Sequence, residues 1–172
     1  MFYALSNQQE RVLVPSCDSK IILGNINAKN TVTVVTNLHC SPCANAHIKL
    51  MNLIKSNTDI KIQYVFTEFS SELRKSSLFM IAVLMQKKYD EALSIMSDWY
   101  DYGRFNSDDF ISHTNVDVYN ETVLKEYEKH TIWIQNNNIT STPFVIYNGV
   151  PKPPFYEIED IEYISISPSE SR

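Results

Sequence analysis

Hydrophobic and polar positions follow a strand-like spacing near both ends of the chain and a helix-like spacing in between. Residues 31–36 form a β-branched run without charge, and residues 60–66 alternate between apolar and polar side chains. These patterns predict two strands of one sheet. A helical pattern between them, ending near Ser56, makes the unit strand–helix–strand, which implies a parallel pair with a right-handed crossover. Residues 20–23 and 144–147 predict two further strands.

The middle of the chain, from about residue 70 to residue 138, carries apolar residues at helical spacing. The stripes are Leu78, Ile81, Ala82, Leu84 and Met85, then Ala92, Ile95, Met96 and Trp99, then Val123, Leu124, Tyr127, Ile132 and Trp133. Core packing is the simplest interpretation of such stripes, and a substrate groove along one face is the alternative. Farther along, Asn148 and Gly149 predict a hairpin turn, and residues 157–164 favour a short terminal helix.

Two cysteines two residues apart stand between the first strand and its helix, in the order Cys40, Ser41, Pro42, Cys43. Strand, Cys-x-x-Cys and helix together are typical of a dithiol redox site. The unpaired N–H groups and the dipole at the helix start favour a thiolate on Cys40. Cys43 lies one turn inside, where it can resolve a mixed disulfide. Pro42 fits the first turn of the helix, where its missing N–H is tolerated.

The cysteine pair is also compatible with a zinc site or with two structural thiols. His39 and His47 stand near enough for half of a zinc site, and His47 follows Cys43 by one helical turn. A structural zinc site needs a second ligand pair, and the only other cysteine, Cys17, has no such pair beside it. We therefore predict no metal, and two buried structural thiols are the simplest non-catalytic alternative. Cys17 is interpreted as incidental, with a third redox cysteine as the alternative.

Composition narrows the class of protein. The chain has 172 residues, of which 44% are hydrophobic, so one domain with a substantial core is expected. A net charge of −5 argues against nucleic acid as a partner. No apolar run reaches membrane-spanning length, and the first residues lack the pattern of a signal peptide. The sequence is therefore expected to be cytosolic, or else a mature form or an excised domain.

Two motifs together resemble the thioredoxin superfamily. One is Cys40-Ser41-Pro42-Cys43 after a central strand, and the other is the Thr-Pro-Phe-Val-Ile-Tyr-Asn-Gly run that contains Thr142 and Pro143. The resemblance implies an α/β thioredoxin fold, with a central mixed β-sheet flanked by helices. It also implies that Pro143 is a cis-proline beside the dithiol, with Thr142 just before it.

The distance between the motifs resembles that of the DsbA-like periplasmic oxidoreductases, which carry an inserted helical subdomain. We expect one domain over residues 1–172, with a thioredoxin-like core at about 20–69 and 131–165 and the insertion at about 70–130. Residues 24–29 and 159–163 resemble the thioredoxin-like domain fused to vitamin K epoxide reductase homologues in bacteria.

The resemblance implies a protein disulfide oxidoreductase whose redox group is the Cys40–Cys43 disulfide, with no dissociable cofactor. Cys40 attacks, Cys43 resolves, and Pro143 with Thr142 holds the substrate chain, while His39, Ser41 and Pro42 support the site. From its position beside Cys40, His39 is expected either to be a surface side chain near the site, which is the simpler interpretation, or to add positive charge there. The implied partners are protein thiols and disulfides, with a membrane-embedded vitamin K epoxide reductase-like oxidase as an electron partner, in an extracytoplasmic, periplasmic location.

Two features qualify the resemblance. Many thioredoxin-like proteins carry a buried carboxylate six residues before the first cysteine, and Val34 stands there in this chain. The Ser41-Pro42 pair between the cysteines resembles the reducing thioredoxins, so the expected activity is that of a reductase or isomerase. The rival from another class is a binding or adaptor module in which the thioredoxin fold holds a partner without catalysis.

Overall fold

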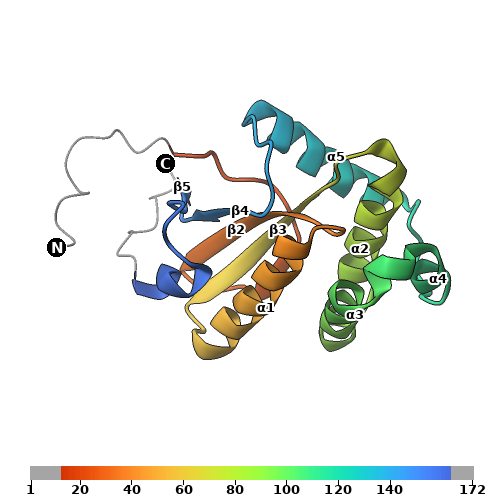
Figure 1. The fold of residues 1–172 in the computed structure, drawn as a ribbon, viewed down its shortest axis with the longest axis horizontal. Helices are drawn as coiled ribbons and strands as arrows, with labels where there is room; N and C mark the ends of the chain where they lie inside the picture. The colour runs from red at the N-terminus through yellow and green to blue at the C-terminus, as the bar shows by residue number, and fades with distance from the viewer. Residues whose placement is uncertain (1–12, 164–172) are drawn as a thin grey trace.

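A sheet of five strands forms the centre of the computed structural model, which describes residues 13–163 (Figure 1). Its strands are β1 Ile22–Gly24, β2 Asn30–Asn37, β3 Ile60–Thr67, β4 Phe144–Tyr147 and β5 Val150–Pro151. They lie in the order β1-β3-β2-β4-β5. β2 and β3 are parallel and the other neighbours are antiparallel. This mixed sheet with flanking helices confirms the predicted fold class.

The predicted strand–helix–strand unit is β2, α1 (Ser41–Ser56) and β3. Successive side chains of a strand point to opposite faces of the sheet, and β2 is buried on both from Val34 to Asn37. Val32 and Val34 pack with Leu50 of α1 in the main core, whereas Val35 packs with Val65 on the other face. A charge-free, β-branched sequence suits a strand covered on both sides.

The region from about residue 70 to residue 138 forms several helices, which pack beside the sheet (Figure 1). They are η2 Ser71–Leu73, α2 Arg74–Gln86, α3 Tyr89–Asp101, η3 Gly103–Asn106, α4 Ser107–Ser112 and α5 Glu121–Asn136. In α2, every residue from Ser76 to Val83 is buried, and Met96 and Trp99 of α3 are fully buried. These two stripes therefore pack in the core. The expected domain division remains a prediction, and position 130 falls inside α5.

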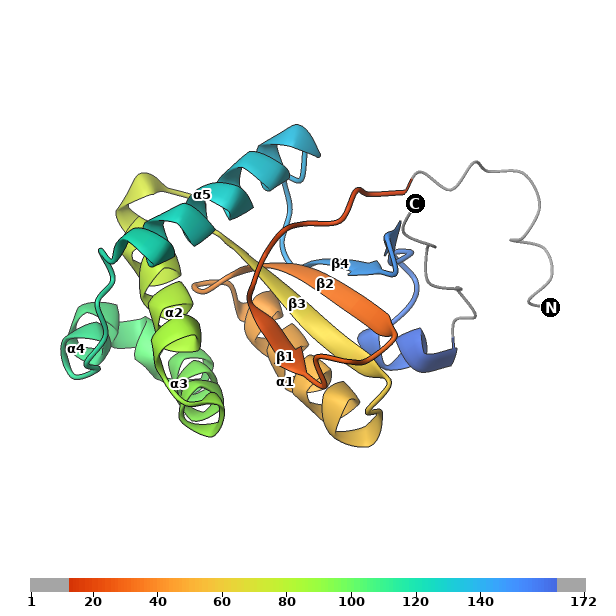
Figure 2. The same ribbon diagram turned by 180° about the vertical axis from the view of Figure 1, so that it is seen from behind.

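The edges of the sheet differ from the sequence-based expectation in detail (Figure 2). β1 begins two residues later than predicted and pairs with β3 through Ile22 and Gln63. The hairpin turn is present, with positive φ at Asn148 and Gly149. The predicted terminal helix is a 3-10 helix, η4 Ile158–Tyr163, and residue 164 lies outside the described part of the chain.

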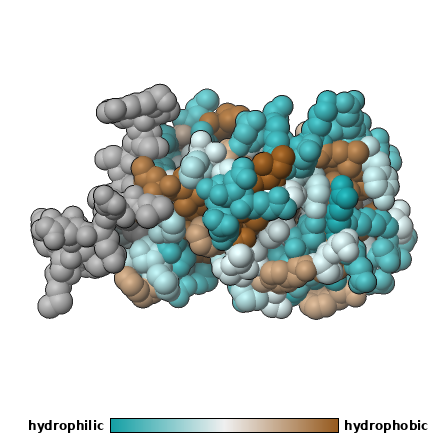
Figure 3. Space-filling model, turned by 90° about the horizontal axis from the view of Figure 1, so that it is seen from above, coloured by the Kyte–Doolittle hydropathy of each residue, from teal (hydrophilic) through white to brown (hydrophobic). Residues whose placement is uncertain are grey.

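Within residues 13–163, no helix is both long and apolar enough to cross a membrane. Figure 3 shows one face of the molecule coloured by hydropathy. Hydrophobic residues appear there as separate patches among hydrophilic ones.

Candidate active site

The dithiol is built where β2 ends and α1 begins. A turn at Leu38 and His39 brings Cys40 to the N-cap of α1 in an extended conformation. Its sulfur accepts a hydrogen bond from the Cys43 main-chain N–H at 3.3 Å. The sulfur therefore satisfies one of the donors that a helix start leaves unpaired. The sulfurs of Cys40 and Cys43 are not bonded to each other in this structure.

The two sulfurs lie in different surroundings. Cys40 is half-buried, whereas Cys43 is only 1% exposed. The main-chain N–H of Asn37 donates to the Cys43 sulfur at 3.4 Å. Burial, and after it the hydrogen bond with Cys40, raises the pKa of Cys43 to about 11. Cys43 is thus an inner thiol that stays protonated at neutral pH, and Cys40 is the more exposed of the two sulfurs.

The loop before β4 completes the site. The Thr142–Pro143 peptide bond is cis, the isomer that the resemblance implied. Thr142 lies against Cys40, since its carbonyl accepts from the Cys40 sulfhydryl and its hydroxyl donates to the same sulfur, both at 3.9 Å. The fold therefore brings together segments that are 102 residues apart in the sequence.

The remaining predicted residues lie around this centre. Ser41 and Pro42 are exposed in the first turn of α1. His39 is partly exposed beside the site, and its ring pairs with the Ser76 hydroxyl at 2.7 Å. It also meets Trp99 edge-on, with ring centroids 5.5 Å apart. Burial, and then the charge of Arg104, lowers the pKa of His39, which disfavours a cation beside Cys40.

Several neighbours of the site could not be identified from the sequence. Arg104 of η3 donates to the Ser41 hydroxyl at 3.2 Å, and the Trp99 indole donates to the Leu38 carbonyl at 2.9 Å. Both come from the inserted helices, where the pattern around them predicts only a helix. Thr36 of β2 was also not identified as a neighbour of the site, although the alternation of side chains along the strand points to it. It stands two positions after Val34 on the same strand, so it faces the same side of the sheet.

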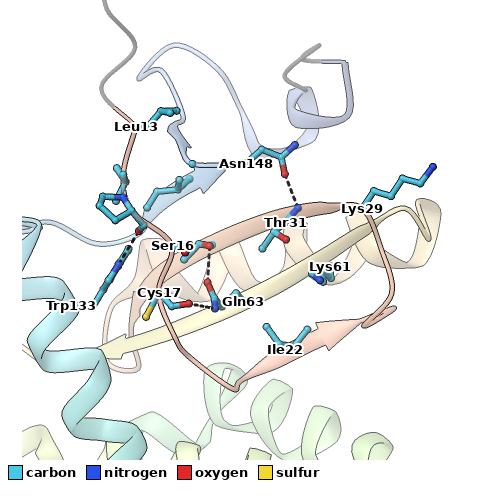
Figure 4. A pocket seen from close by; sticks show the side chains of 15 residues that line it. Leu13, Ser16, Cys17, Ile22, Lys29, Thr31, Lys61, Gln63, Trp133 and Asn148 are labelled. Atoms are coloured by element: carbon cyan, nitrogen blue, oxygen red, sulfur yellow. Dashed lines mark hydrogen bonds between the residues drawn. The ribbon is translucent and has the colours of Figure 1, made fainter. Parts of the chain in front are cut away.

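Cys17 lies on the other face of the sheet from the dithiol. It packs with Val35 and Val65, whereas Cys43 belongs to the cluster on the α1 side. Figure 4 shows Cys17 at the wall of a cavity of about 570 Å³ that is also lined by Trp133 and Gln63. Burial raises the pKa of Cys17 to about 11. These surroundings suit an unreactive structural thiol.

The two histidines near the dithiol are engaged elsewhere. His47 is buried in α1, and its ring pairs with the Tyr64 hydroxyl at 3.0 Å, while His39 pairs with Ser76. Within the described residues, no group of three or more His, Cys, Asp or Glu side chains is arranged to hold a metal ion.

The sheet order, the cysteine pair at a helix start and the nearby cis-proline loop define a thioredoxin-like dithiol protein. A sequence model of the Thioredoxin family matches residues 16–152, which is most of the chain, so this protein belongs to that family. The match confirms the predicted class, a thioredoxin-like thiol–disulfide oxidoreductase. No curated protein matches the chain.

Solved structures show the same fold at low sequence identity. BdbD from Bacillus subtilis, in its oxidised form, is 17% identical with a TM-score of 0.62, over 83% of this chain and 89% of that chain. A periplasmic thioredoxin-like protein from Salmonella enterica serovar Typhimurium is 14% identical with a TM-score of 0.66, over 83% and 85%. The catalytic domain of Proteus mirabilis ScsC is 12% identical with a TM-score of 0.67, over 83% and 84%.

Proposed function

We propose that the protein exchanges disulfides with protein substrates through Cys40 and Cys43, acting as a reductase or isomerase. The observation that carries the proposal is the pairing of an accessible sulfur at a helix N-cap with a buried one a turn inside. The redox group is the Cys40–Cys43 disulfide itself, and no dissociable cofactor takes part.

In the reducing direction, the Cys40 thiolate attacks one sulfur of a substrate disulfide. A Cys40–substrate disulfide forms, and the other substrate sulfur leaves with the electron pair of the broken bond. Cys43 then attacks the Cys40 sulfur, which closes the Cys40–Cys43 disulfide and releases the second substrate thiolate. The substrate gains two electrons and the dithiol loses two.

The loop at Thr142 and Pro143 is proposed to hold the substrate chain beside the sulfurs. The Thr142 main chain lies against Cys40, at a point where an extended peptide can add to it by main-chain pairing. Ser41, Pro42 and His39 form the rest of the rim from which a substrate approaches.

The redox direction follows from the residues between the cysteines. Ser41 and Pro42 provide no ring nitrogen to donate to the Cys40 sulfur, and proline stiffens the turn in favour of the closed disulfide. We expect a reduction potential nearer that of thioredoxin, about −270 mV, than that of a strong oxidant, about −120 mV.

Equilibration with glutathione tests this direction. At a poise of about −180 mV the protein should be almost entirely oxidised, which alkylation of the remaining thiols and mass measurement detect. A protein that stays largely reduced at that poise would instead be an oxidant.

An extracytoplasmic location is part of the proposal, supported by the periplasmic description of the Salmonella relative. The resemblance to domains fused to vitamin K epoxide reductase homologues supports a second form, in which such a membrane-embedded oxidase reoxidises the dithiol. Reconstitution with that oxidase should then drive Cys40–Cys43 disulfide formation. The non-catalytic adaptor is distinguished by a simpler assay, since an adaptor would not reduce a model disulfide.

A further inference from the structure

Cys43 needs an outlet for its proton. To attack the Cys40 sulfur it must become a thiolate, yet its side chain is buried and lacks the contact with bulk water that a surface thiol would have. The Asn37 main-chain N–H at 3.4 Å can stabilise a thiolate, but it cannot accept a proton. A side chain that faces Cys43 and can both accept and donate a proton would provide this outlet.

Two hydroxyl groups form a buried chain beside this sulfur. Thr36 of β2 and Tyr100 of α3 are 2% and 4% exposed, and their hydroxyl oxygens are 2.8 Å apart. The Thr142 hydroxyl and, after it, the Thr36 hydroxyl both oppose the increase that burial causes in the pKa of Cys43. A hydroxyl both donates and accepts hydrogen bonds, so a proton can pass between Thr36 and Tyr100 in either direction.

Tyr100 is also one of the residues that line a groove between α1 and α3. Tyr100 lines the groove together with Ala44, His47, Ser97 and Arg104, and the cavity measures about 580 Å³. Arg104 donates to the Tyr100 carbonyl at 3.0 Å and so fixes the end of α3 at this wall. Water in a cavity of this size can take a proton from the Tyr100 side.

We propose, on the basis of the thiol–disulfide exchange above, that Thr36 and Tyr100 relay the Cys43 proton between the sulfur and water in the α1–α3 groove. During resolution the Cys43 S–H proton passes to the Thr36 oxygen, the Thr36 proton to Tyr100, and the Tyr100 proton to water. The Cys43 sulfur then bonds to the Cys40 sulfur, and the substrate sulfur leaves with the electron pair. The reverse steps return the proton when the disulfide is reduced.

The pH dependence of resolution should report on Cys43, because the pKa values of the histidines and tyrosines around it are shifted away from neutral pH. The titratable and charged groups around it are Cys40, His39, His47, Tyr64, Tyr100 and Arg104. Cys40 carries no proton in the mixed disulfide, and burial lowers the pKa of His47 to about 4. Burial also raises the pKa values of both tyrosines well above their ordinary range.

The test separates the two chemical steps by stopped flow with dithiobis(nitrobenzoate), a disulfide that releases coloured thionitrobenzoate. The first thionitrobenzoate reports attack by Cys40 and the second reports resolution by Cys43. Thr36→Val should slow the second phase about tenfold and raise its pH midpoint by about one unit. Tyr100→Phe, which acts through Thr36, should slow it about threefold. The first phase should be unchanged in both variants.

Two matched variants control for packing. Thr36→Ser keeps the hydroxyl and should restore the second phase. Tyr147→Phe removes a hydroxyl from another buried tyrosine, which pairs with Val32 toward the far end of β2, and should resolve at the wild-type rate. Wild-type resolution in Thr36→Val and Tyr100→Phe, or equal slowing in Thr36→Val and Thr36→Ser, would overturn the relay. Failure of the wild-type protein to release a second thionitrobenzoate would instead overturn the proposed function.

Discussion

The reacting sulfurs and the side chains around them come from two regions that are held in place differently. The β2–α1 unit carries Cys40 and Cys43, and fixes them by the sheet register and the helix N-cap. The inserted helices reach the site through side chains, and each contact joins one inserted residue to one core residue. These contacts are Ser76 to His39, Trp99 to Leu38, Tyr100 to Thr36 and Arg104 to Ser41.

This difference indicates that the two regions contribute to the site in different ways. Main-chain hydrogen bonds of a strand and a helix start fix the backbone positions of Cys40 and Cys43. The inserted helices decide which polar groups surround those sulfurs, since α2 and α3 share one continuous core with the sheet. Changes in the core unit should therefore abolish chemistry, and changes in the insertion should alter stability, proton transfer or selectivity.

The largest expected effect is the loss of all exchange on removing the attacking sulfur. Cys40→Ser should leave no measurable reduction of a model disulfide such as insulin, because no other described cysteine is both accessible and at a helix start. Cys17→Ser is the matched control and should keep wild-type activity, since Cys17 lies on the opposite face of the sheet. Activity lost with Cys17 and kept without Cys40 would reverse the assignment.

The second largest expected effect is a loss of stability when the contact between the inserted helices and the β2–α1 unit is removed. Trp99 is fully buried against Phe79 and Phe110, and its indole holds the Leu38 carbonyl. Trp99→Ala should lower the free energy of unfolding by about 3–5 kcal/mol, measured by denaturant titration. Phe69→Ala, at a site that is 69% exposed, should change it by less than about 0.5 kcal/mol. Similar values for the two variants would mean that the insertion does not pack as described.

A third effect is a loss of stability in mild acid. Burial lowers the pKa of His47 from its ordinary 6.5 to about 4, so the unfolded chain binds this proton at a higher pH than the folded protein does. The contribution is complete above pH 6.5 and is lost as the pH falls toward 4, by about 3 kcal/mol. His47→Gln should flatten the unfolding free energy across this range. An equally steep pH dependence in that variant would exclude His47 as its source.

The smallest effect distinguishes the three thiols in the folded protein. Burial raises the pKa values of Cys43 and Cys17 to about 11, so the thiolate population of each is about a hundredfold below that of an ordinary cysteine. Iodoacetamide at mildly acidic pH should modify Cys40 well before either, as peptide mapping by mass spectrometry reveals. Denatured protein is the control and should label all three alike, and earlier labelling of Cys17 in the folded protein would count against the assignment.

The sequence predicts the parts of the site that local pattern determines. The Cys-x-x-Cys spacing after a β-branched strand locates the helix start, and the Thr142–Pro143 motif locates the loop beside it. It does not predict Tyr100 or Arg104, because nothing in their own neighbourhood distinguishes them from other residues of an amphipathic helix. Their roles depend on how α3 packs on β2, which involves contacts across about 64 residues. The partners of His39 could not be predicted for the same reason, since Ser76 and Trp99 both come from the insertion.

The central claim, that Cys40 attacks substrate disulfides and Cys43 resolves them, is tested most directly by trapping the mixed disulfide. Reduced Cys43→Ser protein, mixed with a disulfide-bonded protein substrate, should accumulate a covalent complex that a reductant cleaves. Peptide mapping should locate the linkage at Cys40, and the Cys40→Ser/Cys43→Ser double variant should form none. No complex with the single variant, or an equal amount through Cys17 in the double variant, would contradict the claim.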